Sequence, residues 1–361
     1  MSNDQRPTTT TTATVLGSFA VAGVLVVIAL ATLSAQVPSS STSSSSDPFE
    51  FFRPQVNVTA SERSRLDRGE TIVRSAGAVD GQVAIFSATK TSVSGDRLVR
   101  WVHRVDLMKR GKYVPAVVRF SDPPRLSDVD KAELDADDLD ALRRCRPGDC
   151  GLKLSEPEIA QLAPLARARR SDGAAVQQAF RAALFARTQQ YLATGFTGTL
   201  PYRDQDEPVD LAAEFSGLLA QAGFLPQRLP QLTNFLVRYP TAPEPAAESF
   251  LYWSKEILGR KPVISITHVT LMRPEGGPDA VVLSRQVYAT HYVSGSLAIT
   301  AIVGGRDAGT HYLAYLNRSR VDVLDGFFGG LVRRIVERRL RDEAGTVVDA
   351  LRKRIEGGEP E

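Results

Sequence analysis

The chain has 361 residues, of which 43% are hydrophobic and 24% are charged, values that are ordinary for a globular protein. Its formal net charge is only +3, and basic residues are spread among acidic ones, which argues against a nucleic-acid-binding protein. Roughly 300 residues follow the N-terminal segments, enough for one large domain or two small ones.

An uncharged run of 21 residues, Val15–Ala35, lies close to the N-terminus. It is long enough to cross a bilayer as a helix, which needs about 20 apolar residues. The alternative is a cleaved signal peptide, but Arg6 is the only basic side chain before the run, and signal cores are shorter, about 7–15 residues. We therefore predict a cytoplasmic tail over 1–14 and a single transmembrane helix over 15–35. The weak charge bias places the C-terminal domain in the periplasm or outside the cell, tethered to the inner (cytoplasmic) membrane.

Serine and threonine fill the stretch 39–46 that follows the apolar run. Such a segment buries too little apolar surface to fold by itself. The composition predicts a flexible linker over 36–60 and a globular domain over 61–361.

The first part of this domain begins with a strand over 82–92, where β-branched and aromatic residues alternate with a period of two. A helix capped by Ser94 is expected over 96–108, followed by a short strand over 113–120. Residues from about 122 to 250 are predicted to be mostly helical. The capping-box spacing of Ser155 and Glu158 begins one of these helices, and a longer helix is expected over 172–193.

The last third changes to strand periodicity. Strands are predicted over 263–271, 280–292, 296–303 and 312–317, joined by glycine-rich turns, which is typical of an antiparallel meander. A long helix is expected from about 325 to 356.

Cys145 and Cys150 are the only cysteines and flank a Pro-Gly turn signal. In an oxidising compartment this spacing predicts a local disulfide. Free structural thiols and a metal or redox pair are the alternatives.

The order of strand, helices, antiparallel strands and long final helix resembles the helix-grip fold of the START and polyketide-cyclase-like superfamily. The resemblance covers roughly 81–108 and 262–356 and rests on the order of elements. It implies an α+β fold in which a curved antiparallel sheet wraps the C-terminal helix, with a large helical insertion at about 122–250. It also implies binding of a lipid or another apolar ligand between the sheet and that helix.

Six side chains in or just after the predicted strands of the meander are candidates for contacting such a ligand. By alternation, histidines at two of these positions share a face with apolar neighbours, and an arginine there would bind an anionic head group. The alternative is that these polar side chains pair across a solvent-facing side of the sheet. The candidates are His268, Arg285, Tyr288, His291, Tyr315 and Arg320.

The sequence contains none of the common catalytic signatures, such as a nucleophile elbow, a Walker loop or a dinucleotide fingerprint. We assign no catalytic residue, metal ligand or cofactor. The leading hypothesis is a membrane-anchored protein that binds a lipid or other apolar ligand without catalysis. The alternative is an interaction protein that docks a partner through the helical insertion and has no ligand cavity.

Overall fold

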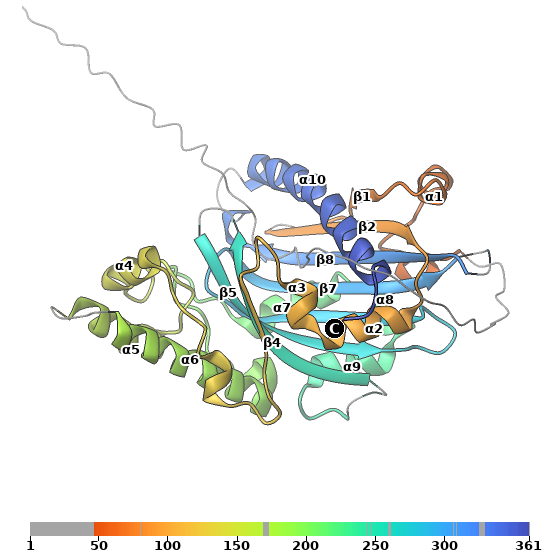
Figure 1. The fold of residues 1–361 in the computed structure, drawn as a ribbon. Coiled ribbons are helices and arrows are strands. Elements are labelled where there is room, and N and C mark those ends of the chain that lie inside the picture. Colours follow the sequence, from red (N-terminus) through yellow and green to blue (C-terminus); the bar gives the residue numbers. More distant parts are fainter. Residues whose placement is uncertain are drawn as a thin grey trace, which may run out of the picture.

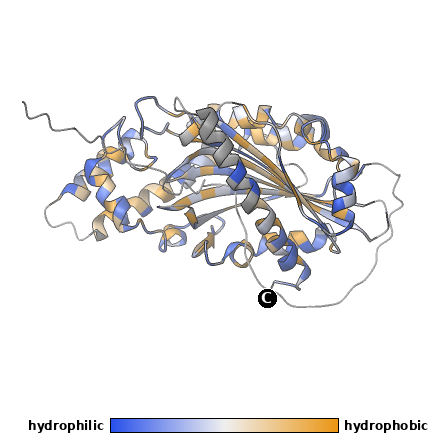
Figure 2. Ribbon diagram, turned by 90° about the horizontal axis from the view of Figure 1, so that it is seen from above, coloured by the Kyte–Doolittle hydropathy of each residue, from blue (hydrophilic) through white to orange (hydrophobic). Residues whose placement is uncertain are grey.

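The computed structural model describes residues 47–360, apart from 80, 169–172, 244, 246, 259–260, 306, 308 and 325–328. Its described strands form one antiparallel sheet in the order β1-β2-β8-β7-β6-β5-β4-β3. The sheet is curved, and helices cover both of its faces (Figures 1 and 2). The predicted α+β class with a curved antiparallel sheet is confirmed. The strands are β1 Ile72–Ser75, β2 Gln82–Thr91, β3 Ala116–Arg119, β4 Ala247–Leu258, β5 Lys261–Met272, β6 Ala280–Ala289, β7 Val293–Gly304 and β8 His311–Val321.

The helices fall into three sequence groups. Those outside the insertion are η1 Glu50–Phe52, α1 Ala60–Asp67, α2 Gly95–His103, α3 Val105–Lys109, η4 Asp322–Leu324 and α10 Gly329–Glu356. The first half of the insertion contains η2 Leu126–Val129, α4 Ala136–Arg144, α5 Glu156–Arg167 and α6 Ala174–Thr194. The second half contains η3 Gly195–Gly198, α7 Leu211–Ala220, α8 Phe224–Arg228 and α9 Pro230–Arg238.

One face of the sheet, here called the α10 face, packs against α2, α3 and α10. Alternate residues of β8 point to it, including Leu313 and Tyr315, which join a core with Leu98 of α2 and Val348 of α10. Hydrogen bonds tie the end of the chain to α2 and α3. The Trp101 Nε1–H donates to the Gly358 carbonyl at 2.9 Å, and a guanidinium N–H of Arg354 donates to the Met108 carbonyl at 2.7 Å.

The opposite face, here called the insertion face, is covered by the helices between β3 and β4. The other residues of β8, such as Ala314 and Leu316, point to this face and pack with α7, α8 and α9. Near the β4–β5 edge, Trp253 and Ile266 pack with α5 and α6. Because both faces are covered, the long strands are buried nearly throughout.

Two expected elements differ from the structure. The helix predicted over 96–108 is divided into α2 and α3 at Arg104, whose φ of −103° and ψ of 50° are not helical. The helical region expected to reach 250 ends earlier, because β4 begins at Ala247 and runs along the sheet between β5 and β3.

The N-terminal residues that follow the apolar run are packed from Asp47 onward, although a flexible linker was expected up to residue 60. Phe49 and Phe52 are fully buried on the insertion face, where their rings contact Phe86 of β2. Their large apolar area stabilises this attachment. The predicted transmembrane helix over 15–35 lies outside the described residues. No described helix combines the length and apolar character needed to span a bilayer.

Candidate functional site

Two adjoining hollows lie on the α10 face of the sheet, the first under helices α2, α3 and α10 and the second beside Lys109 of α3. They share four lining residues from the middle of the sheet: Tyr252, Ser284, Ala298 and Tyr315. The first hollow, of about 60 Å³, has a mostly apolar wall, with Leu98, Val102, Val105 and Met108 on one side and Val347, Val348 and Leu351 of α10 on the other. The second, of about 40 Å³, continues along the sheet over polar side chains. We call the two together the α10 cavity.

The polar end of the α10 cavity is built around a buried ion pair. Lys109 is the last residue of α3, and its Nζ lies 2.6 Å from Glu256 Oε1 of β4. The same ammonium group lies 3.1 Å from the Tyr252 hydroxyl. Burial alone would lower the pKa of Lys109, but the charge of Glu256 and the Tyr252 hydroxyl outweigh burial and raise this pKa above its ordinary value.

Polar side chains from the central strands continue this end of the cavity. The Asn317 side-chain amide donates to the Ser296 hydroxyl at 3.0 Å, and the Ser319 hydroxyl lies 2.8 Å from Asn317 Oδ1. Burial raises the pKa of Tyr315, which disfavours the tyrosinate form even further. The α10 cavity therefore has an apolar half and a polar half with a charged floor, as an amphipathic ligand would require.

Of the six residues proposed from the sequence, Tyr315 lines the α10 cavity. His268 and Arg285 are neighbours across β5 and β6, but they point to the insertion face. Arg285 Nη2 lies 2.7 Å from His268 Nδ1, and Arg285 Nη1 donates to the Leu236 carbonyl of α9 at 3.0 Å. The rings of Tyr191 and Tyr239 enclose the guanidinium at 5.4 and 4.5 Å.

This enclosure changes the protonation of both side chains. Burial, and then the neighbouring positive charge of Arg285, hold the pKa of His268 well below its ordinary value. Burial also lowers the pKa of Arg285. His268 is therefore neutral and accepts hydrogen bonds from Arg285. The pair holds helices α6 and α9 on the sheet, and neither side chain reaches the α10 cavity.

Tyr288 and Arg320 also lie away from the α10 cavity. Tyr288 is buried among the insertion helices, with the Arg187 guanidinium 4.7 Å from its ring, and burial raises its pKa. Arg320 Nε lies 3.4 Å from the Glu214 carboxylate of α7. The predicted solvent-facing pairing of these polar side chains does not occur, because helices cover them.

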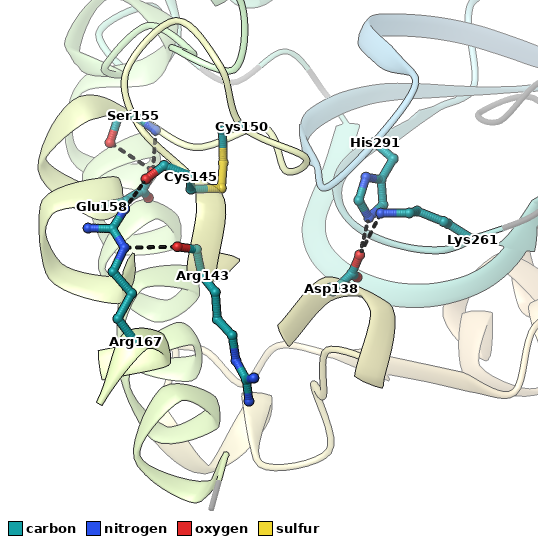
Figure 3. The surroundings of a disulfide bond; sticks show 9 residues. All are labelled: Asp138, Arg143, Cys145, Cys150, Ser155, Glu158, Arg167, Lys261 and His291. Carbon is teal, nitrogen blue, oxygen red and sulfur yellow. Dashed lines mark hydrogen bonds and ion pairs between the residues drawn. A yellow bond between two sulfur atoms is a disulfide. The ribbon is translucent and has the colours of Figure 1, made fainter. Parts of the chain in front are cut away.

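His291 lies in a third place, at the end of the sheet where it meets the insertion. Its Nε2 is 3.0 Å from Asp138 Oδ1, and the Lys261 Nζ approaches the same oxygen at 3.4 Å (Figure 3). These groups line or adjoin a separate polar cleft of about 520 Å³. The structure thus divides the six candidates among three locations instead of one site.

The predicted disulfide between Cys145 and Cys150 is confirmed, with a Cα–Cα distance of 4.3 Å. It closes the turn after α4, and the Arg167 side chain of α5 donates to the Cys145 carbonyl at 2.6 Å (Figure 3). The bond fixes the turn that joins α4 to α5.

Sequence reasoning missed Lys109, Tyr252 and Glu256. The two β4 residues lie on the α10 face together with Ser254, but both faces of β4 are buried, so the sequence shows no clear alternation that marks them. Lys109 sits among other basic residues, and nothing in its neighbours marks it as buried.

No family model matches this chain, and no match was found among curated proteins or solved structures. Within the part of the chain that the structure describes, no group of three or more His, Cys, Asp or Glu side chains is arranged to hold a metal ion.

Proposed function

We propose that this protein binds an apolar or amphipathic ligand, without catalysis, in the α10 cavity. The observation that carries the proposal is the division of this cavity into an apolar half under α10 and a polar half over Lys109 and Glu256. A hydrocarbon group in the first half would bury apolar surface, and a head group would lie near the ion pair.

The placement of α10 supports the resemblance to the helix-grip fold. Two helices follow β2, the last five strands follow one another as neighbours in the sheet, and α10 lies across the face that contains the cavity (Figure 1). The large insertion enters at the β3–β4 connection and packs on the other face. It therefore leaves the cavity side of the fold unaltered.

The size of the cavity restricts the ligand. One water molecule needs about 10–15 Å³ of such space, so hollows of about 60 and 40 Å³ accommodate a small group in this conformation. Sites for drug-sized ligands are larger, about 300–1,000 Å³. A long acyl chain therefore requires α10 to move away from the sheet, and a short-chain amphiphile does not.

Partner docking through the insertion is the alternative function, and it would require a continuous exposed apolar patch. The large apolar side chains exposed in the described part of the insertion are Leu126, Leu200 and Val237, on three separate segments. This scatter gives no support to a docking face, so ligand binding is the function we propose.

We further propose that the domain is tethered to the membrane by residues 15–35 and works in the periplasm or outside the cell. The uncharged length of that run and the disulfide, which persists in oxidising compartments, support this location. Alkaline carbonate extraction tests the tether. The full chain should stay with membranes, and its release into the supernatant would contradict an uncleaved anchor.

Native mass spectrometry of the full chain, purified in mild detergent, tests the binding function. We expect a bound mass that denaturation releases, and we expect Ala298→Leu to abolish it, because Ala298 lines both halves of the α10 cavity. The matched control is Ala193→Leu, at an exposed position near the end of α6. Uptake that is equal in both variants, or no uptake when short- and long-chain fatty acids are offered, would refute the proposal.

A further inference from the structure

The polar cleft lies where the insertion meets one end of the sheet, near the β6–β7 turn and η4. The insertion contributes Asp137 of α4, the loop after the disulfide and Asp204. The sheet side contributes the start of β5, the β6–β7 turn and Asp322 of η4, directly after β8. The cleft of about 520 Å³ is lined by Asp137, Cys150, Gly151, Lys153, Asp204, Lys261, Thr290, His291, Tyr292 and Asp322. Its volume is within the range of small-molecule sites.

A buried lysine forms one wall of the cleft. The Lys153 side chain is 1% exposed, and its Nζ lies 2.9 Å from Asp322 Oδ1 and 3.3 Å from Asp204 Oδ2. The Ser294 hydroxyl, 3.2 Å from the same ammonium, joins it to β7. The Lys153 ammonium thus already has polar partners within the protein. It holds two carboxylates in fixed positions at the wall of the cleft.

Asp204 retains an unused oxygen. Its Oδ2 faces Lys153, whereas its Oδ1 is buried and has no hydrogen-bond partner within the described part of the chain. A buried carboxylate oxygen without a donor is costly, and more so when the group is charged. A ligand that supplies an N–H donor at this point would remove that cost.

Charge favours a cation as this ligand. The lining carboxylates of Asp137, Asp204 and Asp322 outnumber the ammonium groups of Lys153 and Lys261. Asp138 adds another carboxylate behind His291. Asp137 is exposed at the first turn of α4 and therefore faces the solvent side of the cleft.

The backbone at the sheet side of the cleft is held in an uncommon conformation. Tyr292 has a φ of 64°, which non-glycine residues rarely adopt. The turn is secured by the Asp322 N–H, which donates to the Tyr292 carbonyl at 3.0 Å, and by the Lys153 N–H, which donates to the Thr290 carbonyl at 2.9 Å. These contacts make the wall rigid, so that the carboxylates need little reorganisation when a ligand enters.

We propose that the polar cleft is a second binding site, for a small organic cation that carries an ammonium or guanidinium group. The cationic group pairs with the Asp204 carboxylate at the wall of the cleft, and Asp137 stabilises its charge from the open side. Guanidinium groups pair well with carboxylates, because their planar N–H donors match two acceptor oxygens. This site is separate from the α10 cavity and does not depend on the function proposed for that cavity.

Isothermal titration of the full chain in non-ionic detergent with agmatine tests the site. We expect saturable binding of one agmatine per chain and no binding of butylurea, which has a planar polar group without the charge. Asp204→Asn should weaken agmatine binding at least about tenfold, because the hydrogen bond to a charged acceptor is lost. Asp137→Asn, at an exposed position where folding is not at risk, should weaken it by about threefold.

The control variant is Asp149→Asn, which removes a 67% exposed carboxylate of the same disulfide loop outside the cleft. It should bind agmatine as the wild-type chain does. The proposal is overturned if agmatine gives no saturable heat, if butylurea binds equally well, or if Asp149→Asn weakens binding as much as Asp204→Asn and Asp137→Asn do.

Discussion

Lys109 Nζ and Glu256 Oε1 lie 2.6 Å apart inside the α10 face, with side chains that are 2% and 7% exposed. The pair joins the end of α3 to β4, although these residues are far apart in the sequence. Since α3 forms part of the wall of the α10 cavity, the ion pair both fixes that wall and places charge at the polar end of the cavity.

Removing one member of this pair should be more harmful than removing both. We expect Lys109→Met to lower the free energy of unfolding by about 3–5 kcal/mol, because Glu256 is left as an unpaired buried charge. The double variant Lys109→Met with Glu256→Leu should recover most of this loss. Urea denaturation measures both, and the exposed Lys112→Met is the control. Losses that simply add in the double variant would show that the two charges are not coupled.

The neutral His268 predicts a pH dependence of stability. The unfolded chain binds a proton at His268 below about pH 6.5, whereas the pKa of the folded chain is well below that value. Stability should therefore fall as pH decreases through 6.5, by about 1.4 kcal/mol between pH 7.5 and 5.5 from this one group. His268→Gln keeps an acceptor for Arg285 and should remove this component. Parallel curves for the two proteins would disprove the assignment.

The disulfide should contribute modestly to stability because the loop it closes is short. For Cys145 and Cys150, separated by five positions, loop entropy gives about 2 kcal/mol. The double Cys→Ser variant should unfold at correspondingly lower urea concentration. A reducing agent should bring the wild-type chain to the same midpoint and leave the variant unchanged. A wild-type midpoint that does not respond to reductant would contradict this contribution.

The strands β2 and β5 to β8 could be predicted because their residues alternate with a period of two. β4 could not, because both of its faces are buried. Leu251 and Trp253 face the insertion while Phe250 and Tyr252 face α10, so large side chains follow one another without visible alternation. The break between α2 and α3 could not be predicted either, because Arg104, where the break occurs, is neither proline nor glycine.

The candidate site was less predictable for a related reason. Alternation along a strand shows that His268 and Arg285 lie on the opposite face of the sheet from the residues next to them in sequence. It does not show which layer of helices covers that face. Here the insertion covers the face that they occupy, and α10 covers the other. His291 was placed in the sheet interior, and the structure puts it beside Asp138, a residue 153 positions earlier in the chain. Contacts at this separation leave no local pattern.

The two tryptophans of the chain allow the most direct test of the α10 cavity. Trp101 lies on α2 between cavity-lining Leu98 and Val102, whereas Trp253 is buried on the insertion face. A fatty acid brominated on its chain quenches only nearby indoles. With Trp253→Phe, which retains Trp101, we predict saturable quenching. With Trp101→Phe, which retains Trp253, we predict none. Equal quenching of both tryptophans, or no saturable quenching of Trp101, would contradict a ligand bound between the sheet and α10.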